Sequence, residues 1–409
     1  MDEKERVILV GVSTSEGENT EESLSELEEL AKTAGAETLG MIIQKREQIH
    51  PGTYLGTGKL MELLDLIEET QATGIICDDE LSPAQIRNME QYLNTKIMDR
   101  TLIILDIFAE RASTAEGKIQ VELAQLKYRL ARLVGLRSSL SRLGGGIGTR
   151  GPGEKKLEMD RRLIKDRIAS LNRDLKEVKC HRTVNRQQRE KTGIPVVAIV
   201  GYTNAGKSTL LNALTGSEVL EEDKLFATLD PTTRSLELGS GQEVLLTDTV
   251  GFIRKLPHNL IDAFRSTLEE AKYANLIIHV VDASSQTMEI QMHTVYETLR
   301  ELEIENKQIL TLFNKQDQIE EKQNLRDFRA DKTLPISAKT GEGLQKVKEA
   351  LEEFLRDNRV LLERVFPYEE AGKIQYVRKC GELLTEEYRE NGIYIKAFVP
   401  KDWYERLSK

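Results

Sequence analysis

The chain has 409 residues, 39% of them hydrophobic and 31% charged, and a formal net charge of −10. This length predicts roughly two to four domains. No apolar run reaches the ~18 residues of a membrane span, and the acidic balance argues against indiscriminate binding of nucleic acid, DNA included. The cysteines match no metal-ligand spacing and the N-terminus resembles no signal peptide. We therefore expect a cytoplasmic protein without a membrane span.

Residues 1–113 predict a small α/β domain with a mainly parallel sheet. Strand-like apolar runs alternate with segments of helical spacing at 7–12, 21–34, 39–43, 57–69 and 74–77, a helix is expected to start at Ser82 and Pro83, and a fourth apolar run lies within 100–108. Gly56-Thr57-Gly58-Lys59 is interpreted as a helix start, with a loop that touches nucleotide or RNA as the alternative. The acidic Asp78-Asp79-Glu80 is interpreted as a solvated turn, with a metal site as the alternative.

Residues 114–191 predict an antiparallel coiled-coil hairpin. Apolar residues recur at alternating spacings of four and three along two seams, which are Ile119, Leu123, Leu126, Leu130 and Leu133, and then Ile164, Ile168, Leu171, Leu175 and Val178. The glycine-rich residues 144–153 between the seams cannot stay helical. A second helix of about 35 residues would make an arm roughly 50 Å long.

The hairpin is basic around this loop. Residues 127–167 hold 12 Lys and Arg against 4 Asp and Glu, a net charge of +8 that leaves −18 for the rest of the chain. Such asymmetry on a projecting arm favours contact with nucleic-acid phosphates. The candidate contacts are Arg137, Arg142, Arg150, Lys155 and Lys156. The alternative is a solvated coiled coil with a flexible tip.

Residues 192–357 predict a phosphate-loop nucleotide domain. An apolar strand at 196–200 runs into Gly201-Tyr202-Thr203-Asn204-Ala205-Gly206-Lys207-Ser208-Thr209, which has the pattern GxxxxGK(S/T) and opens a helix at 207–215. The backbone N–H groups of such a loop surround phosphates. Lys207 would reach the β- and γ-phosphates, and the Ser208 hydroxyl would bind Mg²⁺.

Two later segments predict a nucleotide-dependent switch. The threonine-rich segment 225–234 offers Thr228, Thr232 and Thr233 as the residue that completes the Mg²⁺ shell, and the residues alone do not choose among them. A strand at 243–247 then ends in Asp248-Thr249-Val250-Gly251. Asp248 would hold Mg²⁺ through water, and the Gly251 N–H would bind the γ-phosphate.

The sequence Asn314-Lys315-Gln316-Asp317 follows an apolar run at 308–313 and predicts selectivity for guanine. Asp317 would accept from the N1 and 2-amino groups, which adenine cannot offer, Asn314 would donate to N7, and the Lys315 stem would lie along the ring. Such a site rejects the wrong base by roughly 10⁴–10⁵. Ser337-Ala338-Lys339 would contact the base oxygen. We therefore expect GTP and not ATP as the nucleotide.

Phe252 stands directly after the DxxG motif, where many small GTPases carry a glutamine that orients the attacking water. An apolar side chain cannot orient water. The sequence therefore predicts slow intrinsic hydrolysis that a partner accelerates.

Residues 358–409 predict a small α+β domain of β-α-β-β type. A strand at 360–367 and a helix at 369–380 precede two strands at 384–390 and 393–399, which flank the hairpin signal Asn391-Gly392. Trp403 and Tyr404 are expected to pack against this unit.

These motifs together resemble the bacterial HflX family of GTPases, and the resemblance spans nearly the whole chain. Its specific features are GTGKL at 56–60, GGGIGTRGPGE at 144–154, FATLDPT at 226–232 and DTVGF at 248–252. It implies an α/β fold in which the GTPase domain is joined to an N-terminal α/β domain, a helical hairpin and a small C-terminal domain. Within Phe226, Ala227, Thr228, Leu229 and Asp230, it selects Thr228 as the Mg²⁺ residue.

The same resemblance implies a function and a partner. Family members bind the large (50S) ribosomal subunit and its ribosomal RNA, with the hairpin loop reaching towards the peptidyl-transferase centre, and split stalled ribosomes as cytoplasmic monomers. Some members use ATP in the N-terminal domain, where this chain has no phosphate loop. The alternative is a GTP-dependent signalling switch that docks a protein through its helical arm, and a third reading is an RNA-remodelling NTPase with the N-terminal domain as motor.

Overall fold

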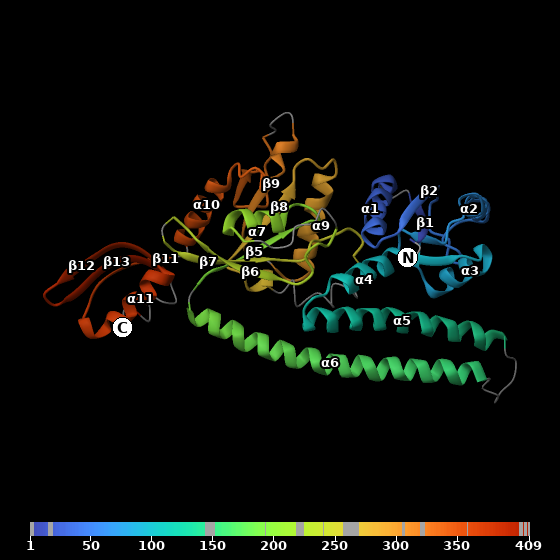
Figure 1. Cartoon of the computed structure of the whole chain (residues 1–409), viewed down its shortest axis with the longest axis horizontal. Helices are drawn as coiled ribbons and strands as arrows, with labels where there is room; N and C mark the ends of the chain where they lie inside the picture. Colours follow the sequence, from blue (N-terminus) through green and yellow to red (C-terminus); the bar gives the residue numbers. More distant parts are fainter. Residues whose placement is uncertain are drawn as a thin grey trace. The chain divides into compact units, whose positions relative to one another are not determined.

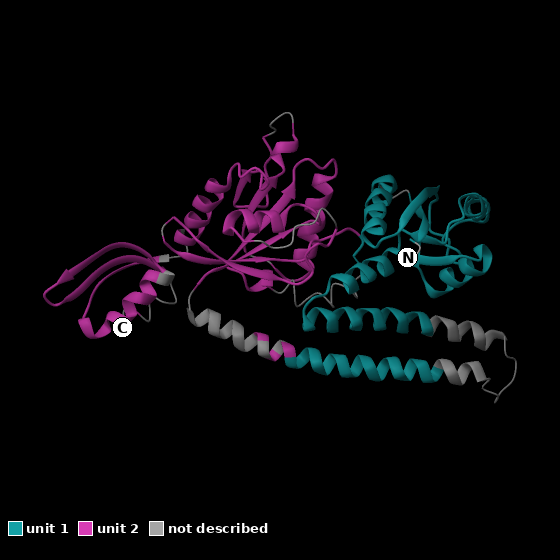
Figure 2. Ribbon diagram, in the orientation of Figure 1, with its two compact units in different colours: residues 1–177, 255–264 teal, residues 178–254, 265–409 magenta. Residues whose placement is uncertain are grey.

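The computed structural model divides into two compact units, residues 1–177 with 255–264 and residues 178–254 with 265–409 (Figure 2). The structure describes residues 4–14, 19–143, 152–192, 194–217, 225–239, 241–256, 270–304, 307–319, 324–357 and 359–400, together with Tyr404 and Leu407. The two units are described separately below.

The first unit contains a four-stranded parallel sheet of order β2-β1-β3-β4 (Figure 1). Its elements are β1 (Arg6–Ser13), α1 (Thr20–Thr33), β2 (Glu37–Lys45), α2 (Thr57–Thr70), β3 (Gly74–Cys77), α3 (Pro83–Leu93), β4 (Lys96–Asp99) and α4 (Arg100–Arg111). Strand side chains alternate between the two faces, so Ile8 and Val10 join one buried cluster with apolar residues of α2 and α3. This confirms the predicted N-terminal α/β domain.

Three local expectations in this unit have clear outcomes. Helix α3 begins at Pro83, and Ser82 forms a capping box with Gln85, as predicted. The apolar run within 100–108 is helical and not a strand, because Asp99 accepts from Leu102 N–H at 3.0 Å and caps α4, leaving only four residues for β4. The interpretation of Asp78-Asp79-Glu80 as a solvated turn is wrong for Asp78, which is fully buried, whereas Asp79 is half-buried and Glu80 is exposed.

The hairpin consists of α5 (Ala115–Leu143) and α6 (Pro152–Thr192). Seam residues of both helices are buried, Leu123 in α5 and Leu171 in α6, and Arg167 donates through Nε to Glu122 Oε1 at 2.7 Å. Helix α6 has 41 residues, so it is about 60 Å long. It begins at Pro152, inside the predicted loop, because proline fits the first helical turn.

The middle of α5 is fixed to the carboxyl end of β4. Tyr128 donates to Asp99 Oδ1 at 2.6 Å, and Arg132 donates to Asp99 Oδ2 at 2.7 Å. These hydrogen bonds therefore anchor α5 to the N-terminal sheet. Its tip at 144–151 and the five basic side chains expected to touch RNA lie outside the part that the structure describes.

The second unit is built on a six-stranded sheet of order β10-β9-β8-β5-β7-β6, in which only β6 is antiparallel to its neighbour. Its elements are β5 (Val196–Gly201), α7 (Lys207–Thr215), β6 (Thr232–Glu237), β7 (Glu243–Asp248), β8 (Leu276–Asp282), α9 (Met288–Glu301), β9 (Gln308–Asn314), β10 (Lys332–Pro335) and α10 (Leu344–Asp357). Parallel strands bring their carboxyl ends to one edge, where ligands bind in open α/β sheets. The expected phosphate-loop fold is confirmed.

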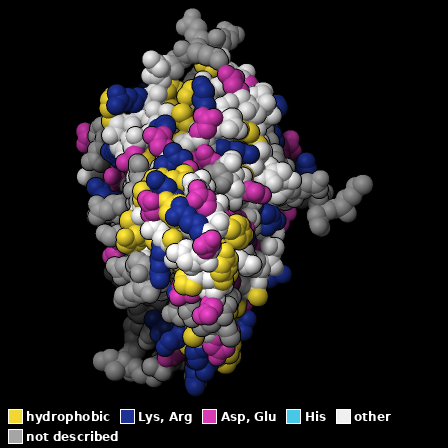
Figure 3. All heavy atoms as spheres, turned by 90° about the vertical axis from the view of Figure 1, so that its left-hand side faces the viewer, with side chains coloured by type: hydrophobic (Ala, Val, Ile, Leu, Met, Phe, Trp, Pro, Cys, Tyr) yellow, Lys and Arg dark blue, Asp and Glu magenta, His cyan; other side chains and the backbone are white. Residues whose placement is uncertain are grey.

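The C-terminal part of this unit is an antiparallel sheet of order β11-β13-β12 with one helix packed on it. Its elements are β11 (Arg359–Phe366), α11 (Ala371–Cys380), β12 (Glu382–Arg389) and β13 (Gly392–Pro400). Tyr404 packs against its core, and Trp403 lies outside the described residues. On the face shown in Figure 3, side chains of both charge signs are interspersed with small hydrophobic patches.

Candidate nucleotide-binding site

The phosphate loop connects β5 to α7, as the sequence predicts. Gly201 is required by close packing, because a Cβ there would lie 2.3 Å from the backbone oxygen of Val280. Gly206 has a left-handed φ of +91°, and a Cβ on it would lie 2.3 Å from Asn314 Nδ2. Both glycines therefore let the loop curl tightly against the carboxyl ends of the neighbouring strands.

A cavity of about 430 Å³ opens beside this loop. It is lined by Thr203, Asn204, Gly206, Lys207, Ser208, Thr209, Phe226, Ala227, Thr228, Gly251, Asn314, Lys315, Asp317, Gln318, Ala338 and Lys339. All of these except Gln318 are among the residues expected from sequence. Of the other expected residues of the nucleotide site, Tyr202, Ala205 and Leu229 are buried, and Asp230 is half-buried.

Three predicted magnesium-binding residues lie together, and two of them, Ser208 and Thr228, line the cavity. The Ser208 hydroxyl lies 2.8 Å from that of Thr228 and donates to Asp248 Oδ2 at 2.7 Å. Thr232 and Thr233 lie instead in β6, paired with β7. The geometry thus brings Thr228, and not Thr232 or Thr233, beside Ser208 and Asp248, where the sequence predicts the metal ion.

The donor set fits a magnesium ion. Hydroxyl and carboxylate oxygens are the hard ligands that Mg²⁺ prefers. Asp248 Oδ1 and Thr203 Oγ1 are buried and have no hydrogen-bond partner among the described residues. Buried polar atoms of this kind are costly unless a ligand or ion satisfies them.

The charges of Lys207 and Asp248 are both held out of water. Burial lowers the pKa of the Lys207 ammonium to about 8, and Asp248 offsets this only in part. Burial likewise raises the pKa of Asp248, against the attraction of Lys207 and hydrogen bonds from Ser208 and Thr228. The Lys207 ammonium donates to the Tyr202 carbonyl at 2.7 Å. A phosphate and a cation at this place would stabilise both charged forms.

The predicted base-binding residues come together at the ends of β9 and β10. Ser337 donates to Asp317 Oδ1 at 2.6 Å and so orients the carboxylate. Lys315 has a left-handed φ of +63° and lies 2.7 Å from Asp282 Oδ2. Sequence reasoning named Ser337 only for its backbone and gave no role to Asp282, although Asp282 ends a buried strand and that position was a usable signal.

Asn314 does more than the sequence suggests. Its Nδ2 donates to the Ala205 carbonyl at 2.9 Å, and its Oδ1 accepts from the Ala338 N–H at 2.9 Å. The side chain therefore braces the phosphate loop against the Ser337–Lys339 loop. One N–H of the amide remains for the expected contact with guanine N7.

The segment after Asp248 is paired with the phosphate loop. Phe252 N–H donates to the Gly201 carbonyl at 3.1 Å, and Thr203 N–H donates to the Phe252 carbonyl at 2.8 Å. The Phe252 side chain is 2% exposed and does not line the cavity. It therefore packs in the core, at the position where many small GTPases carry a glutamine.

Known proteins share this organisation along the chain. Residues 21–109 match the family model "GTP-binding GTPase N-terminal", 111–189 match "GTP-binding GTPase Middle Region", and 196–315 match "50S ribosome-binding GTPase". The GTPase HflX of Lacrimispora saccharolytica is 65% identical over 405 residues, which cover 99% of this chain and 96% of the relative. The chain belongs to the HflX family of GTPases.

This chain is also similar to more distant proteins. The GTPase HflX of Escherichia coli K12 is 43% identical over 87% of this chain and 84% of its own. A crystal structure of a GTP-binding protein from Sulfolobus solfataricus in complex with GDP is 25% identical, with a TM-score of 0.45, over 85% of this chain and 98% of that one.

As an HflX-family member, the chain is a ribosome-associated GTPase that uses GTP, GDP and Mg²⁺. None of its described helices has the length and apolar character needed to cross a bilayer.

Proposed function

We propose that this GTPase binds the large ribosomal subunit through its hairpin and uses a GTP-dependent switch to split or rescue stalled 70S ribosomes. The observation that carries the proposal is the combination of an assembled switch-type nucleotide site with a helical arm fixed to a sheet. The family description of residues 196–315 as a 50S ribosome-binding GTPase supports the partner. We further propose a cytoplasmic monomer with domains at 1–113, 114–191, 192–357 and 358–409.

Each residue of the site has a proposed task. Lys207 binds the β- and γ-phosphates, and the Gly251 N–H donates to the γ-phosphate. The contacts of Lys207 and Gly251 therefore change when the γ-phosphate is lost. Ser208 and Thr228 ligate Mg²⁺ directly, and Asp248 holds it through water. Bound Mg²⁺ supplies charge neutralisation at the phosphates.

The first experiment measures phosphate release from GTP by the purified protein, alone and with isolated large subunits. Because Phe252 cannot orient water, we expect slow turnover alone and roughly tenfold or greater stimulation, about 1.4 kcal/mol of barrier or more. Lys207→Ala should abolish both activities. Fast turnover alone that large subunits leave unchanged would contradict the proposal.

A second experiment tests the hairpin as the anchor. Changing Arg142, Arg150, Lys155 and Lys156 to alanine should weaken subunit binding and lower the slope of log affinity against log salt by about 3 to 4, because each residue is expected to neutralise one phosphate. A matched control changes the exposed hairpin residues Lys118, Lys165, Arg173 and Lys176. Binding that is insensitive to salt and to the first set would favour a protein-docking arm instead.

A further inference from the structure

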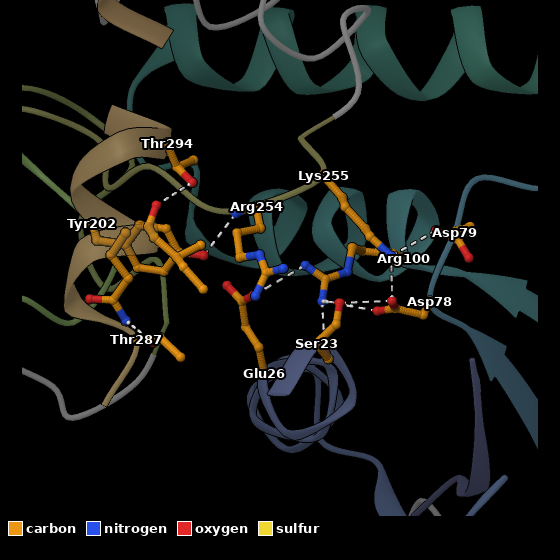
Figure 4. A network of polar contacts seen from close by, with 12 residues as sticks. Ser23, Glu26, Asp78, Asp79, Arg100, Tyr202, Arg254, Lys255, Thr287 and Thr294 are labelled. Atoms are coloured by element: carbon orange, nitrogen blue, oxygen red, sulfur yellow. Dashed lines mark hydrogen bonds and ion pairs between the residues drawn. The ribbon is translucent and has the colours of Figure 1, made fainter. Parts of the chain in front are cut away.

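An ion-pair cluster includes Lys255, which lies shortly after the predicted switch segment 248–251. Lys255 follows Gly251 by four residues, yet its contacts place it in the first compact unit. Its ammonium lies 2.6 Å from Asp78 Oδ2 and 2.7 Å from Asp79 Oδ1, at the carboxyl end of β3 (Figure 4). The Asp78 and Asp79 carboxylates thus converge on one lysine from a strand about 180 residues earlier in the chain.

The cluster is built for charge balance. Asp78 is buried, accepts from Ser23 at 2.7 Å, and pairs with the buried Arg100 at 3.1 Å. Tyr54 donates to the second oxygen of Asp79 at 2.6 Å. Burial alone would raise the pKa of Asp78, but Arg100 and Lys255 hold it below its usual range. Removing Lys255 would take away one of the two cations that hold the pKa of Asp78 down, together with the ion pair of Asp79.

Lys255 also holds an unusual backbone conformation. Its φ is +53°, in the left-handed region that lysine seldom adopts. Such residues persist where surrounding contacts determine them, and they gather at switch regions. One residue earlier, Arg254 N–H donates to the Tyr202 hydroxyl at 2.9 Å. The segment 252–255 is therefore held by the phosphate loop at one end and by the acidic pair at the other.

The residues of the nucleotide site indicate which nucleotide the contacts of Lys255 would favour. In the same arrangement Ser208, Thr228 and Asp248 lie within hydrogen-bond distance, and Gly251 lines the cavity. These are the groups expected to contact Mg²⁺ and the γ-phosphate. If Lys255 makes these contacts only in this arrangement, they will stabilise it relative to one from which Gly251 has withdrawn.

We propose that Lys255, held by Asp78 and Asp79, is a positioning residue that favours GTP over GDP by fixing the segment after Gly251 to the end of β3. The proposal rests on the proposed nucleotide switch, but it requires nothing of the ribosome. Its tests use the full chain and nucleotide alone, so its failure is distinguishable from failure of the ribosomal function.

The first test compares dissociation constants for fluorescent GDP and GTPγS in Lys255→Asn. Asparagine tolerates the left-handed conformation, so the variant removes the charge without adding backbone strain. We expect GTPγS to bind at least about fivefold more weakly, the lower end of typical coupling, and GDP to change less than about twofold. Lys255→Arg should restore much of the loss. Lys272→Asn, which breaks an exposed pair with Glu303, should change neither constant.

A cycle with Asp79→Asn tests whether the pair acts as a unit. Asp79 is partly exposed, so this change spares the buried core. Each single variant and the double variant should lose GTPγS affinity by a similar factor. Additive losses, or an unchanged ratio of GTPγS to GDP affinity in Lys255→Asn, would overturn the proposal.

A reciprocal measurement excludes a purely structural role. Because coupling between sites is mutual, GTPγS should slow hydrogen exchange of the amides at 78–82 relative to GDP in the wild type. The difference should vanish in Lys255→Asn. Equal exchange with both nucleotides in the wild type would contradict the coupling.

Discussion

Replacing Asn314 with alanine should weaken nucleotide binding by a similar factor whether or not the base carries N7. The side chain links two loops of the site through the Ala205 carbonyl and the Ala338 N–H, both buried. Leaving a buried group unsatisfied costs about 1–3 kcal/mol. Two such groups give about 2–6 kcal/mol, or roughly 30- to 20,000-fold in affinity if the whole cost falls on the binding-competent loops.

The assay compares GDP with 7-deaza-GDP, which lacks N7, by titration calorimetry. If Asn314 is mainly a brace, Asn314→Ala weakens both ligands equally. Asn275→Ala is the control, because its Oδ1 accepts from Val196 N–H at 2.8 Å at the opposite end of the sheet. A variant that lost GDP affinity but bound 7-deaza-GDP as the wild type does would refute the brace, and the N7 contact would be its main role.

Three further predictions concern the switch and the core. Phe252→Gln should not raise intrinsic phosphate release, because this position is buried outside the cavity, and should lower unfolding free energy by about 2–4 kcal/mol. Gly251→Ala should weaken the binding of GTPγS more than that of GDP in direct titrations. The Cβ of the alanine would lie 2.9 Å from Lys207 Nζ and from the Thr203 backbone. Burial lowers the pKa of His279, so the unfolded chain takes up a proton below about pH 6.5 that the folded chain does not. The contribution of His279 to the free energy of unfolding is therefore complete above about pH 6.5. It falls as the pH is lowered, by at most about 1.4 kcal/mol per pH unit. In urea titrations, the free energy of unfolding should therefore fall less between pH 7 and pH 5 in His279→Gln than in the wild type.

Much of the site was predictable because its chemistry is contiguous in sequence. The phosphate loop and the Asn314–Asp317 motif each follow a buried strand, and parallel strands carry them to one edge. Thr228 was different, since three threonines lie within six residues. Only the register of β6 with β7 removes Thr232 and Thr233 from the cavity, and register is a property of tertiary pairing.

Other features needed contacts that no local pattern contains. The run within 100–108 has the apolar composition of a strand, and its helical state depends on the cap by Asp99. Asp78 looked solvated because it stands beside two other acids, whereas Arg100 and Lys255 neutralise it from distant positions. Burial of a charge is decided by its partner, and here one partner lies 177 residues away.

The position of Phe252 also limits how a partner can accelerate hydrolysis. To reach the cavity, its segment would break two backbone hydrogen bonds to the phosphate loop and expose a buried aromatic ring. The ring costs about 1.5–3 kcal/mol to expose, and the two bonds about 1–3 kcal/mol together. A total of about 3–6 kcal/mol exceeds the 1.4 kcal/mol that a tenfold acceleration requires. We therefore expect an activating partner to contribute or order a group at the open side of the cavity, leaving Phe252 where it is.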